Sequence, residues 1–138
     1  QGIYQLKPYP IYDAAKRFTS EMYIDGTLMC LSFGIKKNLK LGKGGMILTD
    51  SIDAVEALKK LRWSGRHEST AMSDDEVNSM GYNSYITPEW AARGLMLLGV
   101  YPQHHPDQYE EGGYPDLSRY GFIKRHQASK GVGFYETR

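Results

Sequence analysis

The stretch 28–45 constrains the fold of this chain more than any other part of its sequence. Mostly apolar residues run from Leu28 to Phe33 and stop at Gly34. A pair of lysines follows, and then a bend that holds three glycines within residues 42–45. This pattern predicts a buried strand that carries a lysine into a glycine-rich turn.

Lys37 is the residue of this stretch with the most distinctive chemistry. Lysine forms Schiff bases with carbonyl compounds, and a lysine at the end of a buried strand is well placed for that role. The glycines do not have the spacing of a dinucleotide-binding or Walker loop, so they indicate a turn into the next strand rather than a nucleotide site.

The rest of the chain contains both short apolar runs typical of strands and apolar residues at helical spacing. Ser51 is a suitable N-cap for one helix, and Thr87 followed by Pro88 is a suitable start for a second. We expect the first helix to pack an apolar face on the sheet, and the second to bury Ala91, Ala92, Leu95 and Leu98. The predicted strands are 9–12, 27–33 and 45–50, and the predicted helices begin at Ser51 and Thr87.

The composition is that of a globular protein and gives no case for a nucleic-acid or membrane partner. Hydrophobic residues make up 41% of the chain and charged residues 24%. Seventeen basic side chains nearly balance sixteen acidic ones, which leaves a net charge of +1. The single cysteine, Cys30, lies within a predicted strand, and no residue pattern indicates a metal site. We find no long apolar run or signal peptide and expect a cytoplasmic protein.

Two segments carry a resemblance to a known family. The first, SFGIKKNLKLGKGG, is similar to the lysine segment of the DegT/StrS type of sugar aminotransferase, a group of fold-type I enzymes that use pyridoxal 5'-phosphate (PLP). The second, GYNSYITPEWAARGLMLL, is similar to the family's Gly-Tyr-Asn segment and the helix after it. Gly34 and Lys43 depart from the pattern, since the family usually has His and Glu there. The matching residues of the first segment are Ser32, Phe33, Lys37, Asn38, Leu39, Gly42, Gly44 and Gly45.

The resemblance assigns roles to four residues. Lys37 is the catalytic lysine that binds PLP, and Ser32 binds the cofactor phosphate. Asp13 lies beside the pyridine nitrogen, where its charge keeps the ring protonated and a better electron sink. Asn83 reaches the phosphate of the neighbouring subunit, which implies a homodimer. Without the resemblance, Asp13 is more simply the cap of a helix that begins at Ala14.

The implied fold is an incomplete part of the three-layer α/β/α large domain of PLP-dependent transferases. Residues 1–99 are expected to belong to this domain, and residues 100–138 to an extended arm or the start of a small domain. We therefore expect the chain to be a fragment of a longer enzyme.

The implied activity moves an amino group from an amino acid, typically glutamate, to a keto-sugar nucleotide. One alternative is a non-catalytic remnant or interaction module that keeps the scaffold. Another is a PLP-dependent sugar dehydratase, a branch that usually replaces the lysine with His, so Lys37 argues against it.

Overall fold

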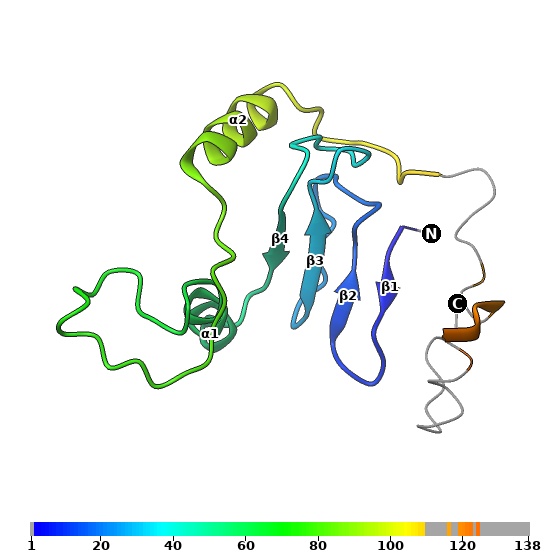
Figure 1. The fold of residues 1–138 in the computed structure, drawn as a ribbon. Coiled ribbons are helices and arrows are strands. Elements are labelled where there is room, and N and C mark those ends of the chain that lie inside the picture. Colours follow the sequence, from blue (N-terminus) through cyan, green and yellow to red (C-terminus); the bar gives the residue numbers. More distant parts are fainter. Residues whose placement is uncertain (1, 110–115, 117–118, 123, 125–138) are drawn as a thin grey trace.

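The computed structural model describes residues 2–109, 116, 119–122 and 124, which form a four-stranded sheet and two helices (Figure 1). This is part of an α/β domain, as predicted. The predicted arm 100–138 is described only to residue 109 and at a few later positions, and its remainder lies outside the described residues. No helix in the described ranges is long and apolar enough to cross a membrane. The elements are β1 (Tyr4–Gln5), β2 (Ile11–Asp13), β3 (Leu28–Ser32), β4 (Gly45–Leu48), α1 (Ile52–Arg62) and α2 (Pro88–Gly99).

The sheet is mixed, with strand order β1-β2-β3-β4. The central strands β2 and β3 are parallel and pair Asp13 with Cys30, whereas both outer pairs are antiparallel. The return of β4 alongside β3, with Gly45 opposite Ser32, confirms the hairpin-like pairing expected from the sequence. Because β2 and β3 are parallel, their carboxyl ends lie at the same edge of the sheet.

The bend between β3 and β4 needs its glycines for their backbone conformation. Gly42 and Gly44 have φ angles of +100° and +88°, a region that other residues rarely adopt. Phe33 bonds to both sides of this bend, because its amide donates to the carbonyl of Gly44 and its carbonyl accepts from the amide of Gly42, each at 2.9 Å. The glycines therefore close the loop that contains Lys37.

The core cluster surrounds this same loop. Phe33, Leu39 and Leu41 are only 4%, 5% and 2% exposed and pack together. Phe33 precedes Lys37 and the two leucines follow it, so buried side chains fix the loop at both ends. The partly buried residues that pack around the cluster are Phe18, Trp90, Leu97 and Tyr101.

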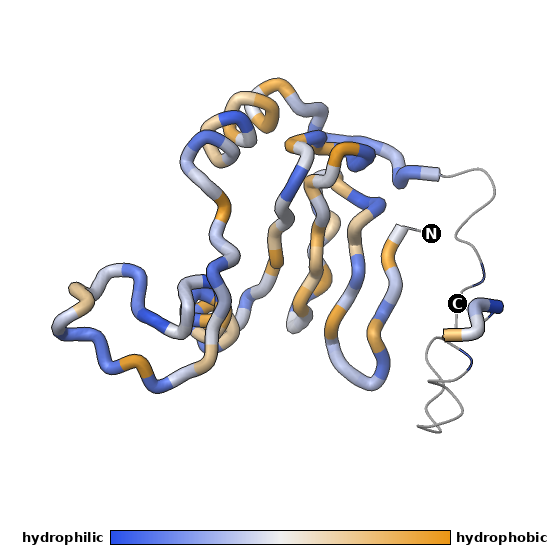
Figure 2. The backbone as a smooth tube through the Cα atoms, viewed as in Figure 1, coloured by the Kyte–Doolittle hydropathy of each residue, from blue (hydrophilic) through white to orange (hydrophobic). Residues whose placement is uncertain are grey.

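Both helices begin where the sequence predicts. The Ser51 hydroxyl accepts a hydrogen bond from the amide of Ala54 at 3.2 Å, which caps α1. Pro88 opens α2, although the side chain of Thr87 makes no capping hydrogen bond. Figure 2 shows hydrophobic residues along much of α2, in contrast to the largely hydrophilic loop that joins the helices.

The predicted burial of the helices is wrong, because neither contains a buried residue. Leu95 and Leu98 of α2 are 71% and 46% exposed. The side of α2 that meets the core instead carries Trp90 and Leu97, with Gly94 placed where an added Cβ would touch Leu41. Apolar residues occupy both of these sides, and helical spacing alone does not say which one the core contacts.

We predict that Leu41→Ala lowers the free energy of unfolding by about 3 kcal/mol, because it opens a cavity in the core. The matched change Leu95→Ala removes the same atoms from an exposed position and should cost less than about 0.5 kcal/mol. Urea denaturation followed by circular dichroism measures both. Equal losses would show that the cluster around Leu41 is not the core.

Candidate active site

Three of the four predicted site residues gather at one edge of the sheet. Asp13 is the last residue of β2 and Ser32 is the last residue of β3. Lys37 follows in the loop that leaves β3 at this edge and is half-buried. In open α/β sheets, ligands bind outside the carboxyl ends of the parallel strands, and these side chains occupy that position.

Gly34 brings Ser32 and Lys37 close together. A Cβ added at Gly34 would lie 3.5 Å from the Ser32 Oγ and 3.6 Å from the Lys37 Cγ. The Gly34 amide donates to the Ser32 Oγ at 3.3 Å, and the Gly34 carbonyl accepts from the Lys37 amide at 2.9 Å. The hydroxyl and the lysine stem therefore flank the same residue in a tight turn, a suitable arrangement for holding two ends of one small molecule.

Asp13 does not cap a helix. Its Oδ1 accepts from the amide of Ala15 at 2.9 Å within a turn, and no helix follows. The amide of Ala14 donates to the carbonyl of Cys30 at 2.8 Å, which extends the pairing of β2 with β3 by one residue. The exposed Asp13 carboxylate is thereby held at the edge of the sheet that leads to Lys37.

The pKa of the Cys30 thiol depends on its burial and on the charge of Asp13 at this edge of the sheet. Partial burial raises its pKa, and the negative charge of Asp13 on the paired strand raises it further. The thiol consequently stays protonated at neutral pH and is a poor nucleophile.

The Asn38 side chain supplies unused polar atoms beside Lys37. Its Oδ1 and Nδ2 are buried and make no hydrogen bond within the described part of the chain. Buried polar atoms without a partner are rare in folded proteins and are often explained by a ligand or water. The lysine loop therefore holds an amide whose hydrogen-bonding capacity is available to a polar ligand or a water.

Asn83, the fourth predicted residue, lies elsewhere. It forms an isolated bridge with Trp63, and its neighbours Tyr82 and Ser84 donate to the carbonyls of Leu61 and Arg62 at 2.6 and 3.0 Å. These contacts place Asn83 beside the end of α1, whereas the Lys37 loop lies near the start of β4 (Figure 1). The structure therefore brings Asp13, Ser32 and Lys37 together and leaves Asn83 apart from them within one chain.

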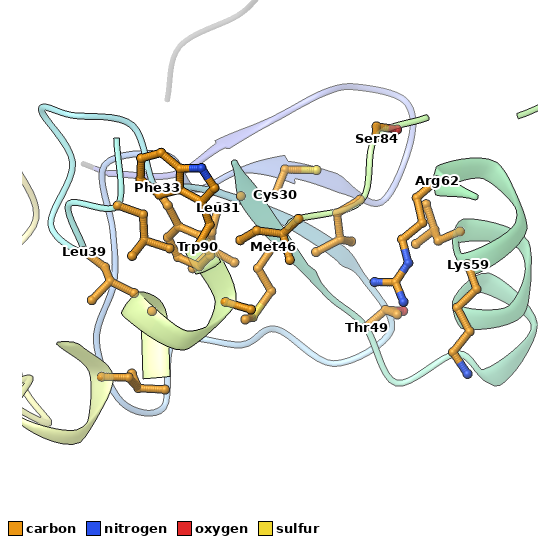
Figure 3. A pocket seen from close by; sticks show the side chains of 18 of the residues that line it. Cys30, Leu31, Phe33, Leu39, Met46, Thr49, Lys59, Arg62, Ser84 and Trp90 are labelled. Carbon is orange, nitrogen blue, oxygen red and sulfur yellow. The ribbon is translucent and has the colours of Figure 1, made fainter. Parts of the chain in front are cut away.

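A groove of about 800 Å³ lies between the sheet and the two helices. Figure 3 shows apolar side chains such as Phe33, Leu39 and Trp90 at one end of it, and Lys59 and Arg62 near the other. Lys37 and Asp13 do not line this groove, so it is distinct from the sheet edge that carries the predicted site.

The structure also shows contacts at this edge that local sequence patterns do not indicate. Arg17 forms an ion pair with Asp107, and the Gln108 side chain bonds to the carbonyl of Lys36. These partners are separated by 90 and 72 residues. Among the described residues, no group of three or more His, Cys, Asp or Glu side chains is arranged to hold a metal ion.

Comparison with known proteins decides the family. The profile of the DegT/DnrJ/EryC1/StrS aminotransferase family matches residues 13–104, well over half of the chain. The chain belongs to this family. A search among curated proteins found no significant match.

The DegT/DnrJ/EryC1/StrS match begins at Asp13 and includes Ser32, Lys37 and Asn83. It ends at residue 104, so Asp107 and Gln108, which contact the lysine loop and the turn after β2, lie beyond it. The family is generally PLP-dependent, and a hydroxyl, an amine and a carboxylate at this edge are groups that suit that cofactor.

We predict that Asp13→Asn makes Cys30 react with iodoacetamide about twofold faster at neutral pH, because loss of the negative charge lowers the thiol pKa. The substituted amide can still accept from Ala15, so the turn is retained. Asp25→Asn, at the opposite end of β3, is the matched control and should leave the rate unchanged. If Asp13→Asn leaves the rate unchanged, the Asp13 carboxylate does not lie close enough to Cys30 to affect the thiol.

Proposed function

We propose that this protein is a PLP-dependent aminotransferase of the sugar-nucleotide type. The amino donor is an amino acid, which we take to be glutamate, and the acceptor is a keto-sugar nucleotide. Membership of the DegT/DnrJ/EryC1/StrS family supports the reaction class. The observation that carries the proposal is the close placement of Ser32 and Lys37 around Gly34, at the edge where the neighbouring parallel strand ends in Asp13.

Each residue at the edge has a chemical task in this proposal. Lys37 would hold the cofactor through its Nζ, Ser32 would donate to the phosphate, and Asp13 would face the ring nitrogen with its negative charge. The bound cofactor supplies an electron sink for the bond that breaks at the amino-acid α-carbon. Once its Nζ is free, Lys37 would take the α-proton from the donor and pass it to the bound cofactor. In the second half of the reaction it would deliver a proton to the acceptor carbon that gains the amino group.

The loop that contains Lys37 is held rigidly, which suits the proposed role of this lysine in proton transfer. Phe33 on one side and Leu39 on the other are buried, so the backbone between them has little freedom. A rigid backbone places the flexible lysine stem reproducibly, and small misplacements of a catalytic group are costly.

We further propose that the functional unit is a homodimer in which Asn83 serves the site of the partner subunit. Two observations support it. Asn83 is exposed and lies apart from Lys37 in its own chain, and α2 leaves apolar residues such as Leu95 and Met96 uncovered. Apolar surface of this kind favours contact with another polypeptide.

For the domain organisation, we propose that residues 1–99 belong to a three-layer large domain and residues 100–138 to an extended arm or the start of a small domain. The end of α2 at Gly99 supports this boundary.

A non-catalytic interaction module is the second candidate function. It is favoured by the same uncovered helices, since neither α1 nor α2 has a buried residue. Cofactor binding distinguishes the two functions, because an interaction module has no need of PLP.

We predict that the protein binds PLP with an absorbance band at about 420 nm, and that Lys37→Ala abolishes this band. Lys36→Ala is the matched control, because it removes the same group from the adjacent and exposed position. Borohydride reduction followed by peptide mass spectrometry should place the label on Lys37. A label on another lysine, or no band in the unchanged protein, would refute the assignment.

We predict that mixing Lys37→Ala subunits with Asn83→Ala subunits restores part of the aminotransferase activity, because some mixed dimers contain one intact site. Mixing Lys37→Ala with Asp13→Asn subunits is the control. Both of those residues serve the same chain's site, so no recovery is expected. Absence of recovery in the first mixture, with mixed dimers demonstrated by mass spectrometry, would place Asn83 outside the partner's site.

A further inference from the structure

The segment 103–108, which we call the strap, crosses the edge of the sheet that carries the predicted cofactor residues. It follows α2 and runs along the end of the sheet where β2 and β3 terminate, as the yellow part of the trace in Figure 1 shows. The DegT/DnrJ/EryC1/StrS match covers only its first two residues. Family membership therefore does not explain what the rest of the strap does.

The first part of the strap is bonded to the segment after β2. The carbonyl of Gln103 accepts from the amide of Ser20 at 2.7 Å and from the Thr19 hydroxyl at 3.3 Å. The amide of His105 donates to the Thr19 Oγ1 at 3.1 Å. The ring of His105 also stacks on Tyr101, with ring centres 5.5 Å apart.

An ion pair fixes the middle of the strap. The Arg17 Nε and one terminal nitrogen donate to the two carboxylate oxygens of Asp107, both at 2.7 Å. The side chains are 27% and 24% exposed, so water screens this pair less than it screens a fully exposed pair. The pairing raises the pKa of Arg17 and lowers that of Asp107, so both groups are charged at neutral pH. A side chain at Gly2 would overlap the Asp107 carboxylate.

Gln108 joins the two segments that carry the proposed cofactor residues. Its amide donates to the carbonyl of Lys16 at 2.8 Å, in the turn that follows Asp13. Its side-chain Nε2 donates to the carbonyl of Lys36 at 2.9 Å, one residue before Lys37. One residue of the strap thus bonds to the backbone on both sides of the site.

We propose that Gln108 is a positioning residue that sets the lysine loop relative to Asp13, with the Arg17–Asp107 ion pair holding the strap in place. This inference rests on the proposed function for its catalytic meaning, whereas the coupling between strap and loop is a property of the protein alone. The hydrogen bonds of Gln108 go to the backbone carbonyls of Lys16 and Lys36 and not to the Lys37 side chain. Gln108 acts through the carbonyl of Lys36.

The first test is hydrogen exchange of the cofactor-free protein, compared with that of Gln108→Glu. The introduced carboxylate keeps the size of the side chain but no longer donates to the Lys36 carbonyl at neutral pH. We expect amides of residues 34–40 to exchange about tenfold faster, while those of β3 are unchanged. Gln103→Glu is the matched control, because it makes the same change at an exposed position of the strap and should match the unchanged protein.

A series of exchange measurements at different pH values tests whether the effect comes from the lost hydrogen-bond donor at residue 108 or from a general loosening of the fold. As the pH falls toward about 4, the introduced carboxyl becomes protonated and can again donate, so the excess exchange of Gln108→Glu should shrink.

Asp107→Asn removes the charge that holds the strap and should accelerate exchange of both residues 16–20 and residues 34–40. It also serves as the second variant if Gln108→Glu does not fold.

The second measurement is PLP binding followed by absorbance. We expect Gln108→Glu to weaken the affinity about fivefold while the urea midpoint of unfolding stays unchanged. Unchanged exchange of residues 34–40 in both folded variants, or equal acceleration throughout the sheet, would overturn the inference. Failure of the unchanged protein to bind PLP would refute the proposed function instead, since the exchange experiments contain no cofactor.

Discussion

The parallel pairing of β2 with β3 is the constraint on which the site depends. Antiparallel pairing would send the ends of these strands to opposite edges and would separate Asp13 from the lysine loop. With parallel strands, Asp13 lies opposite Cys30, and the chain needs only a few more residues to reach Ser32 and Lys37. The pairing therefore brings an anionic side chain, a hydroxyl and an amine to one end of the sheet.

The loop with Lys37 is then held in two different ways. Hydrophobic burial of Phe33, Leu39 and Leu41 fixes its two ends, and this contribution is non-directional. Hydrogen bonds from Gly34 and Gln108 fix the backbone between these ends, and they are directional. Burial keeps the loop on the protein, whereas the hydrogen bonds determine where its carbonyl and amide groups point.

Sequence patterns predict the local features of this molecule well. The strand before Lys37, its return through Gly45, and the starts of both helices follow from turn residues, caps and periodicity that lie within a few positions of one another. Placement of Asp13 at the edge of the sheet also follows, once the strands are taken as parallel.

The contacts that local patterns do not predict are those between distant segments. The side of α2 that meets the core depends on how Trp90 and Leu97 pack beside Leu41. More than one side of this helix is apolar, so helical spacing does not predict which side faces the core. The bonds of Gln108 to Lys16 and Lys36 have no local signature, because a single Gln in a polar stretch rich in Tyr, Pro and His looks like any exposed loop residue. Such contacts depend on packing that periodicity does not encode.

The position of the strap in the chain has a consequence for synthesis on the ribosome. Asp13 and Lys37 emerge early, but the hydrogen bond from Gln108 to Lys36 closes a separation of 72 residues and forms only after α2 has left the ribosome. Contacts between such distant residues form slowly, because the intervening chain loses entropy when its ends meet. A nascent chain that ends before Gln108 thus contains Asp13, Ser32 and Lys37 but lacks the bond that we propose sets their geometry, so the site is complete only after α2 and residue 108 have been made.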